Sequence, residues 1–344
     1  MKFGTFLFTH AADKSRDHEF LKETLAEARA AEDRGMDAVW LAEHHFDGTL
    51  AYVDPISFAA ALAMHTKRVK IGTAVIQAAL HHPIRVAEQL SLIDHLSEGR
   101  LIAGFGKGTM YNPYEYAAFG VDQAIANERF DEMEEIILKC WSGERVAHKG
   151  KFFAFEIPMM RPLPYTKPHP MLIRATGSEE AQAAQAKRGR AFLIAGTNEH
   201  VAKRAELHRA TMRAAGFDEA TIARALAESW AWKNVFIADT DAKAEEMATA
   251  SFQQTLAYRE GLGMASRFVD SYKASGVAVP PAYVFGTPDT VTRKLKPMAA
   301  TGIGGMICRF RNGPMPLSAA LNSMELFLGH VAPALNAPAA AAAQ

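Results

Sequence analysis

The chain has 344 residues, of which 49% are hydrophobic and 22% charged, which is the composition of a globular protein with a large core. Basic and acidic residues number 38 each without a long block of one sign, so we expect neither a nucleic-acid partner nor binding to an anionic membrane. No apolar run approaches the roughly 18 residues of a membrane span, the N-terminus lacks a secretory signal pattern, and the two distant cysteines, Cys140 and Cys308, suit a reducing cytoplasm.

Strand-like and helix-like segments alternate through the first 141 residues. Apolar runs predict strands at residues 2–8, 38–42, 69–76 and 100–105. Apolar residues at helical spacing predict helices at residues 18–34, 56–65, 83–98 and 127–141. Gly35 ends the first helix, and Pro55 and Pro83 suit the first turns of the next two.

The alternation continues through the second half of the chain. Further strands are expected at residues 171–175, 191–195, 230–238 and 305–310. Further helices are expected at residues 179–187, 200–215, 241–261, 288–299 and 317–328. Three stretches fall outside the pattern: a hairpin at 146–155, a proline-rich loop at 158–170 and an irregular region near the end of the seventh unit. The alanine-rich tail, residues 336–344, is expected to be disordered.

Eight strand–helix units without a second cluster of strands predict a closed (β/α)8 TIM barrel, not an open doubly wound sheet. We expect one barrel domain over residues 1–335, with a lid or inserted lobe around residues 259–283. The active site of such a barrel lies at the carboxyl ends of its strands. The candidate site residues at these ends are His10, Glu43-His44-His45, Ala74-Val75, Gly106-Lys107 and Thr176-Gly177-Ser178.

The sharpest of these groups is Glu43-His44-His45, which follows an apolar strand directly. A histidine at a strand end can donate, accept or hold a proton near neutral pH, so this position favours catalysis. The structural alternative is a polar group at the barrel rim, in which a histidine only binds backbone.

Two other groups could together hold a phosphate. Lys107 offers a cation between two glycines, and residues 176–179 offer hydroxyls and free N–H groups at a helix start. Each also has a structural reading: Thr176-x-x-Glu179 fits a capping box, and Gly106-Lys107-Gly108 fits a tight turn. A third group, His81-His82-Pro83 with Glu88, fits a cap of the third helix or a subunit contact.

A metal site is disfavoured although the chain has 13 histidines. Barrel metallohydrolases carry several histidines on the first, fifth and sixth strands, whereas the first strand here offers only His10. The fifth and sixth strands end in Ala175-Thr176 and Ala195-Gly196, so the ligands are too few and we expect no metal.

Six segments, in this order and spacing, resemble the bacterial luciferase-like flavin monooxygenases over residues 1 to about 333. They are MKFGTFL at 1–7, GMDAVWLAEHHF at 35–46, IGTAV at 71–75, HPIRVAE at 82–88, DHLSEGR at 94–100 and VFGTP at 284–288. The resemblance implies a (β/α)8 barrel that receives reduced FMN from a separate flavin reductase. Oxygen then adds at the flavin C4a position, and the peroxyflavin oxidises an organic substrate while the protein excludes water.

The resemblance also implies roles for individual residues. His44 matches the active-site histidine, and Ala74-Val75 matches a pair under the flavin ring that is joined by a cis peptide. Lys107 falls where luciferases have an arginine on the flavin phosphate, and Ser178, with Thr176 and Gly177 before it, matches the phosphate-binding serine.

The chain departs from the family at two of these positions. Gly106 replaces the reactive cysteine of light-emitting members, and Gly177 replaces an acid, which disfavours light emission more than flavin binding. The family also implies a homodimer packed through the second and third helices, with His81, His82 and Glu88 at the interface.

We therefore expect an FMN-dependent two-component monooxygenase that uses oxygen to oxidise a small apolar substrate, such as an aldehyde or ketone. The closest rival function is that of an F420-dependent oxidoreductase on the same barrel, which transfers hydride without oxygen. A metal-dependent barrel hydrolase and a flavin-binding protein without turnover are more distant rivals.

Overall fold

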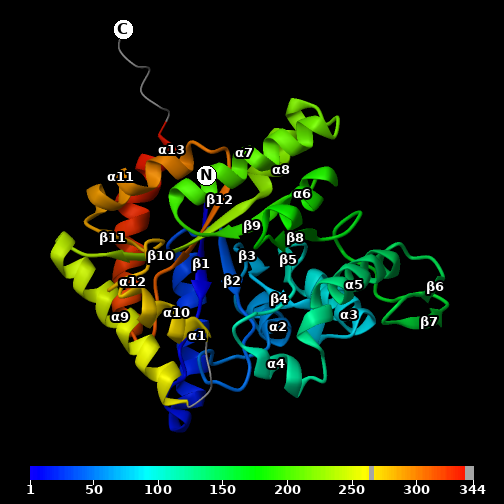
Figure 1. The fold of residues 1–344 in the computed structure, drawn as a ribbon, viewed down its shortest axis with the longest axis horizontal. Coiled ribbons are helices and arrows are strands. Elements are labelled where there is room, and N and C mark those ends of the chain that lie inside the picture. Colours follow the sequence, from blue (N-terminus) through cyan, green and yellow to red (C-terminus); the bar gives the residue numbers. More distant parts are fainter. Residues whose placement is uncertain (263–266, 338–344) are drawn as a thin grey trace.

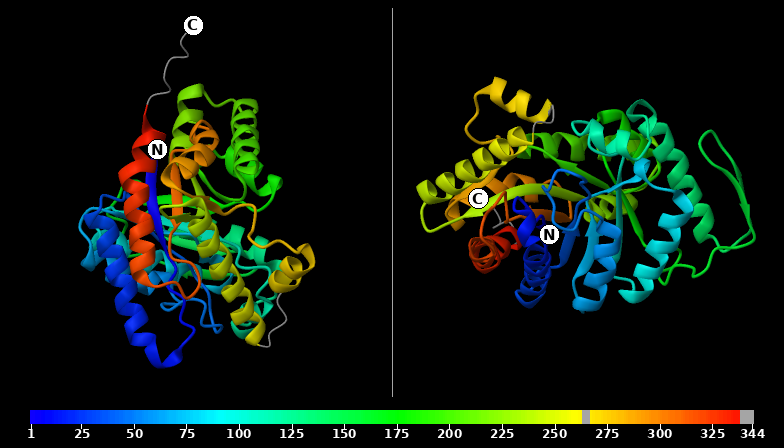
Figure 2. Two further views of the ribbon diagram at one scale, coloured as in Figure 1. Left: turned by 90° about the vertical axis from the view of Figure 1, so that its left-hand side faces the viewer. Right: turned by 90° about the horizontal axis from the view of Figure 1, so that it is seen from below.

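The computed structural model describes residues 1–262 and 267–337, which form a closed barrel of eight parallel strands surrounded by helices (Figures 1 and 2). Each of the eight strands expected from the sequence is present. In chain order they are β1 (Lys2–Leu7), β2 (Ala38–Leu41), β3 (Lys70–Thr73), β5 (Leu101–Gly106), β8 (Met171–Ala175), β9 (Phe192–Ala195), β10 (Trp230–Ile237) and β12 (Gly305–Arg309). The circle closes because β12 pairs with β1 on one side and with β10 on the other.

The helices that connect these strands lie on the outside of the barrel, as the right panel of Figure 2 shows. The predicted ones are α1 (Asp17–Asp33), α2 (Pro55–His65), α3 (Pro83–Leu96), α5 (Ala126–Trp141), α6 (Glu179–Lys187), α7 (Asn198–Ala214), α9 (Asp241–Gly261), α11 (Pro288–Ala299) and α12 (Leu317–Leu326). Their starts follow ordinary capping rules: Asp54, for example, caps α2 by accepting a hydrogen bond from the Ile56 N–H at 2.9 Å. No helix within the described residues is long and apolar enough to cross a membrane.

Two tryptophans fill the interior of the barrel. Trp40 on β2 and Trp230 on β10 belong to strands that are not neighbours, and their rings meet edge to face at 4.9 Å. Glycines on adjacent strands make room for them: a Cβ on Gly72 would lie 2.4 Å from the Trp40 ring, and one on Gly305 would lie 2.2 Å from the Trp230 ring. The interior is therefore packed, and open space is left only towards a barrel end.

The third strand differs from the sequence expectation, which was one unbroken strand over residues 69–76. β3 ends at Thr73, and a separate strand, β4 (Ile76–Gln77), pairs with β5 instead. The Ala74–Val75 peptide between them is cis, as the family resemblance implies. Beyond this break, the N–H of Gln77, the last residue of β4, donates to the side chain of Glu43.

Several insertions lie outside the eight repeats. The predicted hairpin is confirmed as β6 (Val146–Lys149) and β7 (Ala154–Ile157), at the right edge of Figure 1. The sequence analysis missed the elements α4 (Pro113–Ala118), α8 (Glu219–Glu228), α10 (Arg267–Ser275), β11 (Val284–Gly286), η1 (Lys14–Arg16), η2 (Ala78–Leu80), η3 (Gln123–Ile125), η4 (Phe327–Val331) and α13 (Ala332–Asn336). The expected disorder of the tail is wrong for Asn336, which ends α13, and otherwise falls almost wholly on 338–344, outside the described residues.

Candidate active site

A cavity of about 640 Å³ opens at the carboxyl ends of the barrel strands. Its volume falls within the roughly 300–1,000 Å³ of small-molecule sites. Residues at or beyond the carboxyl ends of seven strands line it, together with Trp232 and Asn234 inside β10, as expected of an active site in a barrel. Tyr272 and Pro280, from the segment expected to form a lid, line it as well.

Five of the seven sequence-predicted site residues line this cavity: His44, Ala74, Val75, Thr176 and Gly177. They come from three segments far apart in the sequence, and the barrel brings them together. His10, noted at the end of the first strand, joins them.

Lys107 and Ser178 are not among the residues that line the cavity. Ser178 is the N-cap of α6, where its hydroxyl accepts a hydrogen bond from the Ala181 N–H at 3.2 Å. The capping box expected from Thr176 and Glu179 is therefore wrong, because the cap lies two residues later and Glu179 pairs with Lys203 at 3.0 Å.

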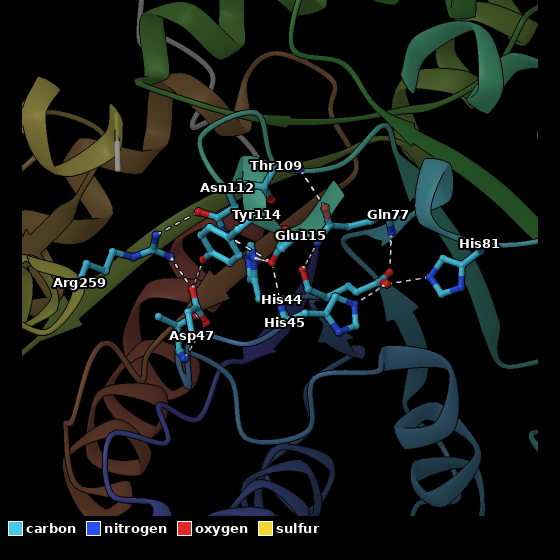
Figure 3. A network of polar contacts seen from close by, with 12 residues as sticks. His44, His45, Asp47, Gln77, His81, Thr109, Asn112, Tyr114, Glu115 and Arg259 are labelled. Atoms are coloured by element: carbon cyan, nitrogen blue, oxygen red, sulfur yellow. Dashed lines mark hydrogen bonds and ion pairs between the residues drawn. The ribbon is translucent and has the colours of Figure 1, made fainter. Parts of the chain in front are cut away.

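Glu43, which is buried, is the centre of a polar network, and Figure 3 labels its partners His45, Gln77 and His81. One carboxylate oxygen lies 2.7 Å from Nε2 of His81 and 2.9 Å from Nε2 of His45. The other accepts a hydrogen bond from the Gln77 N–H at 2.6 Å. The sequence had suggested that His81 caps α3 or meets another subunit, but its ring is bound to Glu43, and α3 has no side-chain cap.

This network fixes the charge of Glu43. Burial alone would raise the pKa of its carboxyl, but the charge of His81 and the hydrogen bonds from both histidines and from Gln77 lower the pKa to about 2. The Glu43 carboxylate in turn raises the pKa of His81 above its usual value, against the effect of burial. Glu43 is therefore ionised at neutral pH, and it ties the end of β2 to β4 and η2.

His44 points away from that network, towards Glu115 of α4 (Figure 3). Its Nδ1 lies 3.5 Å from Glu115 Oε1, and its ring packs edge to face against Phe8. Glu115 is fully buried and also accepts hydrogen bonds from the His45 N–H and the Gln77 side chain, both at 2.9 Å. Because Nδ1 is buried beside this carboxylate, Nε2 is the nitrogen that can exchange a proton with a molecule in the cavity.

A second set of contacts holds the α4 region over the site. Asp47, which is buried, accepts a hydrogen bond from the Tyr114 hydroxyl at 2.9 Å and lies 3.8 Å from the guanidinium of Arg259 on α9. Tyr258, also on α9, donates to the Asp47 carbonyl at 2.9 Å. These contacts join the loop after β2 to two segments that are far from it in the sequence.

The luciferase-like monooxygenase family model matches residues 1–304 of the chain. The chain belongs to this family. It is therefore an oxidoreductase of the monooxygenase class, as the resemblance in its sequence implied.

Two curated relatives of this luciferase-like monooxygenase are monooxygenases themselves. The limonene 1,2-monooxygenase of Rhodococcus erythropolis is 29% identical over 97% of this chain and 86% of its own length. The oxygenase component of the flavin-dependent trigonelline monooxygenase of Acinetobacter baylyi is 31% identical, but the match covers only 49% of this chain and 47% of that protein.

Solved structures show the same barrel. The monooxygenase RslO1 from Streptomyces bottropensis superimposes with a TM-score of 0.81 at 28% identity, over 97% of this chain and 99% of that one. Two more distant structures show the fold alone. The oxygenating constituent of 3,6-diketocamphane monooxygenase from Pseudomonas putida, in complex with FMN, has a TM-score of 0.75 at 19% identity over 97% and 98% of the two chains. An F420-dependent secondary alcohol dehydrogenase has a TM-score of 0.76 at 16% identity over 98% and 99%.

The cavity of this luciferase-like monooxygenase has features that fit a flavin. The cis peptide Ala74–Val75 lies on one wall, and small or aliphatic residues flank it on neighbouring strands. Gly106 allows Val75 its position, because a Cβ there would lie 2.6 Å from the Val75 side chain. Such a wall can receive a flat ring system, and Gly177 precedes the free N–H groups of α6, where an anion is favoured.

The sequence analysis missed the residues that hold the site together. Glu115 and Tyr114 lie between the expected strand 100–105 and the expected helix 127–141, where no element was predicted, and no separate role was predicted for Glu43. The one available signal was the Pro113 position, which suits a first helical turn. Among the described residues, no three His, Cys, Asp or Glu side chains gather as metal ligands would.

Proposed function

We propose that this luciferase-like monooxygenase is the oxygenase of a two-component system, which uses reduced FMN and oxygen to oxidise a small organic substrate. The observation that carries the proposal is His44, which lines the same cavity as the cis Ala74–Val75 wall. A relative named as an oxygenase component supports a separate reductase as the source of reduced flavin.

Different residues would bind the flavin and handle the proton. Ala74 and Val75 would support the flavin ring, while Thr176, Gly177, Ser178 and Lys107 would hold the ribityl phosphate end. When bound, reduced FMN supplies the electrons that activate oxygen. His44 would hold or move a proton through Nε2, and the buried rings around the cavity would exclude water.

An F420-dependent hydride transfer is the second candidate, because an F420-dependent enzyme shares this fold. Anaerobic titrations with reduced FMN and with reduced F420 distinguish the two, since each reports its own dissociation constant. We expect tight binding of reduced FMN, followed by oxygen uptake on aeration. Preferred binding of reduced F420 without oxygen uptake would overturn the proposal.

Lys107 gives a direct test of the phosphate position. Although it does not line the cavity, it follows β5, beside Thr109 at the cavity edge. We expect Lys107→Ala to weaken FMN binding about tenfold and riboflavin binding less than twofold, because only FMN carries the phosphate. Equal losses for both flavins, measured by fluorescence quenching, would show that Lys107 makes no phosphate contact.

We also propose a homodimer packed through α2 and α3. Large apolar side chains are exposed there, with Met64 at 62%, Leu92 at 51% and Leu96 at 38% of their surface. Leu92→Glu should convert the dimer to a monomer in light scattering, whereas Met159→Glu, a matched change near the hairpin, should not. A wild-type protein that is monomeric at micromolar concentration would remove this proposal, and with it the interface role suggested for His82 and Glu88.

We further propose one barrel domain over residues 1–335, a covering role for the segment around residues 259–283 and a cytoplasmic location. The two cysteines, both buried and unpaired, are consistent with that location.

A further inference from the structure

One side of the cavity is polar, although the rest of its wall is apolar. Three residues there come from β10 and from the loops that follow β1 and β12: Asn234, His10 and Asn312 are 2%, 4% and 2% exposed. Both ring nitrogens of His10 and the side-chain oxygens of both asparagines lack a hydrogen-bond partner among the described residues. Buried polar atoms normally have partners, so three such side chains lining one cavity indicate a ligand that supplies them.

Arg309 brings a positive charge to the same place. It is the register partner of Asn234 across β10 and β12, and its carbonyl accepts a hydrogen bond from the Asn312 side chain at 3.0 Å. Its guanidinium lies over the Phe8 ring, 4.0 Å from the centroid, a geometry that leaves the N–H groups at its edge available. Within the described chain the guanidinium donates one hydrogen bond, from Nε to the Arg311 carbonyl, and has no carboxylate within 4.0 Å.

The neighbouring arginine shows the contrast. Arg311 forms an ion pair with Glu23 and lies 4.0 Å from Glu27, so its charge is matched inside the protein. Burial also raises the pKa of Glu27 to about 7, which weakens any compensation of Arg309 by that group. The one acidic side chain among the described cavity-lining residues is Glu43, whose charge is already bound by His81 and His45.

His10 contributes as a neutral donor. Burial, with the nearby charge of Arg309, lowers its pKa to about 4, so one ring nitrogen carries a hydrogen at neutral pH and the other does not. In the recess formed by His10, Asn234, Arg309 and Asn312, the Arg309 guanidinium and one His10 N–H can therefore bind an anion, while the two amide oxygens can accept from donor groups elsewhere on the same ligand.

We propose that this anion recess binds a carboxylate on the substrate, whose apolar body lies against the rings of Phe6, Trp232 and Tyr283 in the same cavity. This inference rests on the proposed oxygenase function. It replaces the small apolar substrate expected from the sequence with an organic acid that has an apolar body.

Matched acids and amides test the recess without any need for turnover. Hexanoate and hexanamide, and cyclohexanecarboxylate and its amide, are titrated into the full-length protein, with the fluorescence of Trp232 in the cavity wall and calorimetry as readouts. We expect each acid to bind about tenfold or more tightly than its amide, because only the acid offers charged acceptors. Equal affinities, or no binding of either acid, would overturn the proposal.

Arg309→Gln should reduce the preference for the acid to about twofold, whereas Arg213→Gln, an exposed arginine on α7, should leave it unchanged. A flavin phosphate is the other anion that could occupy the recess, so FMN and riboflavin are titrated into the same variants. An FMN-specific loss in Arg309→Gln would assign the recess to the cofactor and contradict the proposal. If the protein binds each acid more tightly than its amide but takes up no oxygen with reduced FMN, the anion recess is supported and only the proposed oxygenase function is contradicted.

Discussion

Replacing His44 by alanine should reduce the share of consumed oxygen that reaches organic product by about 100-fold or more, which is the range of a lost general acid or base. The oxygen should appear as hydrogen peroxide instead. His44 lines the cavity, and its Nδ1 lies 3.5 Å from the buried Glu115 carboxylate, so the loss removes a group that can hold a proton at the cavity wall. Flavin binding should change less than about twofold, because we assign the support of the ring to Ala74 and Val75 and not to His44.

The measurement is the ratio of product to peroxide, with oxygen uptake followed in the same sample. His82→Ala is the matched control, because His82 starts α3, packs against Phe153 and does not line the cavity. A ratio unchanged in His44→Ala would show that His44 has no part in the chemistry. Equal uncoupling in His82→Ala would trace the effect to general destabilisation.

Glu43→Gln should lower the free energy of unfolding by about 3 kcal/mol, because it removes the negative partner of a buried charged network and leaves His81 without its counter-charge. For a chain of 344 residues this corresponds to a fall in melting temperature of about 4 °C. Glu88→Gln is the control, since the exposed Glu88–Arg85 pair on α3 should contribute about 1 kcal/mol or less.

The difference between wild type and Glu43→Gln should depend on pH in a defined way. The folded pKa of Glu43, about 2, lies below its ordinary value of 4.5, so its contribution is present above pH 4.5 and is lost as the pH falls towards 2. The folded pKa of His81 lies above 6.5, so its contribution is complete below pH 6.5 and is lost as the pH rises through the folded value. Melting curves should therefore differ most between about pH 4.5 and 6.5. A difference independent of pH would contradict the ionic description of this network.

Much of the barrel was predictable because each buried parallel strand is a short apolar run with a helix after it. The break at Ala74–Val75 was not visible in that pattern, because IGTAVI reads as one strand, and only the family resemblance pointed to the cis bond. The pattern likewise missed α4, a helix of six residues that begins at Pro113 and is too short to show a helical repeat of apolar residues.

The site could be placed from the sequence where its residues lie at strand ends, and His44 and Thr176 line the cavity there as expected. It was not predictable where side chains meet across long sequence distances. Glu115 reaches His44 from a different strand–helix unit, a pairing that no local periodicity encodes. Arg309 was not singled out from the sequence, because its significance depends on the unpaired atoms of His10 and Asn234, which line the same cavity.

The central claim is that the protein uses reduced FMN to activate oxygen. The most direct test is to form the complex of the protein and reduced FMN without oxygen, to mix it rapidly with oxygenated buffer, and to follow oxygen uptake and peroxide release together. Free reduced FMN releases peroxide as it takes up oxygen. We predict that the wild-type complex takes up oxygen and then releases peroxide only after a measurable delay, because the closed cavity protects the reaction from water, and that His44→Ala shortens the delay. Simultaneous uptake and release in the wild-type complex, as in free flavin, would contradict the account.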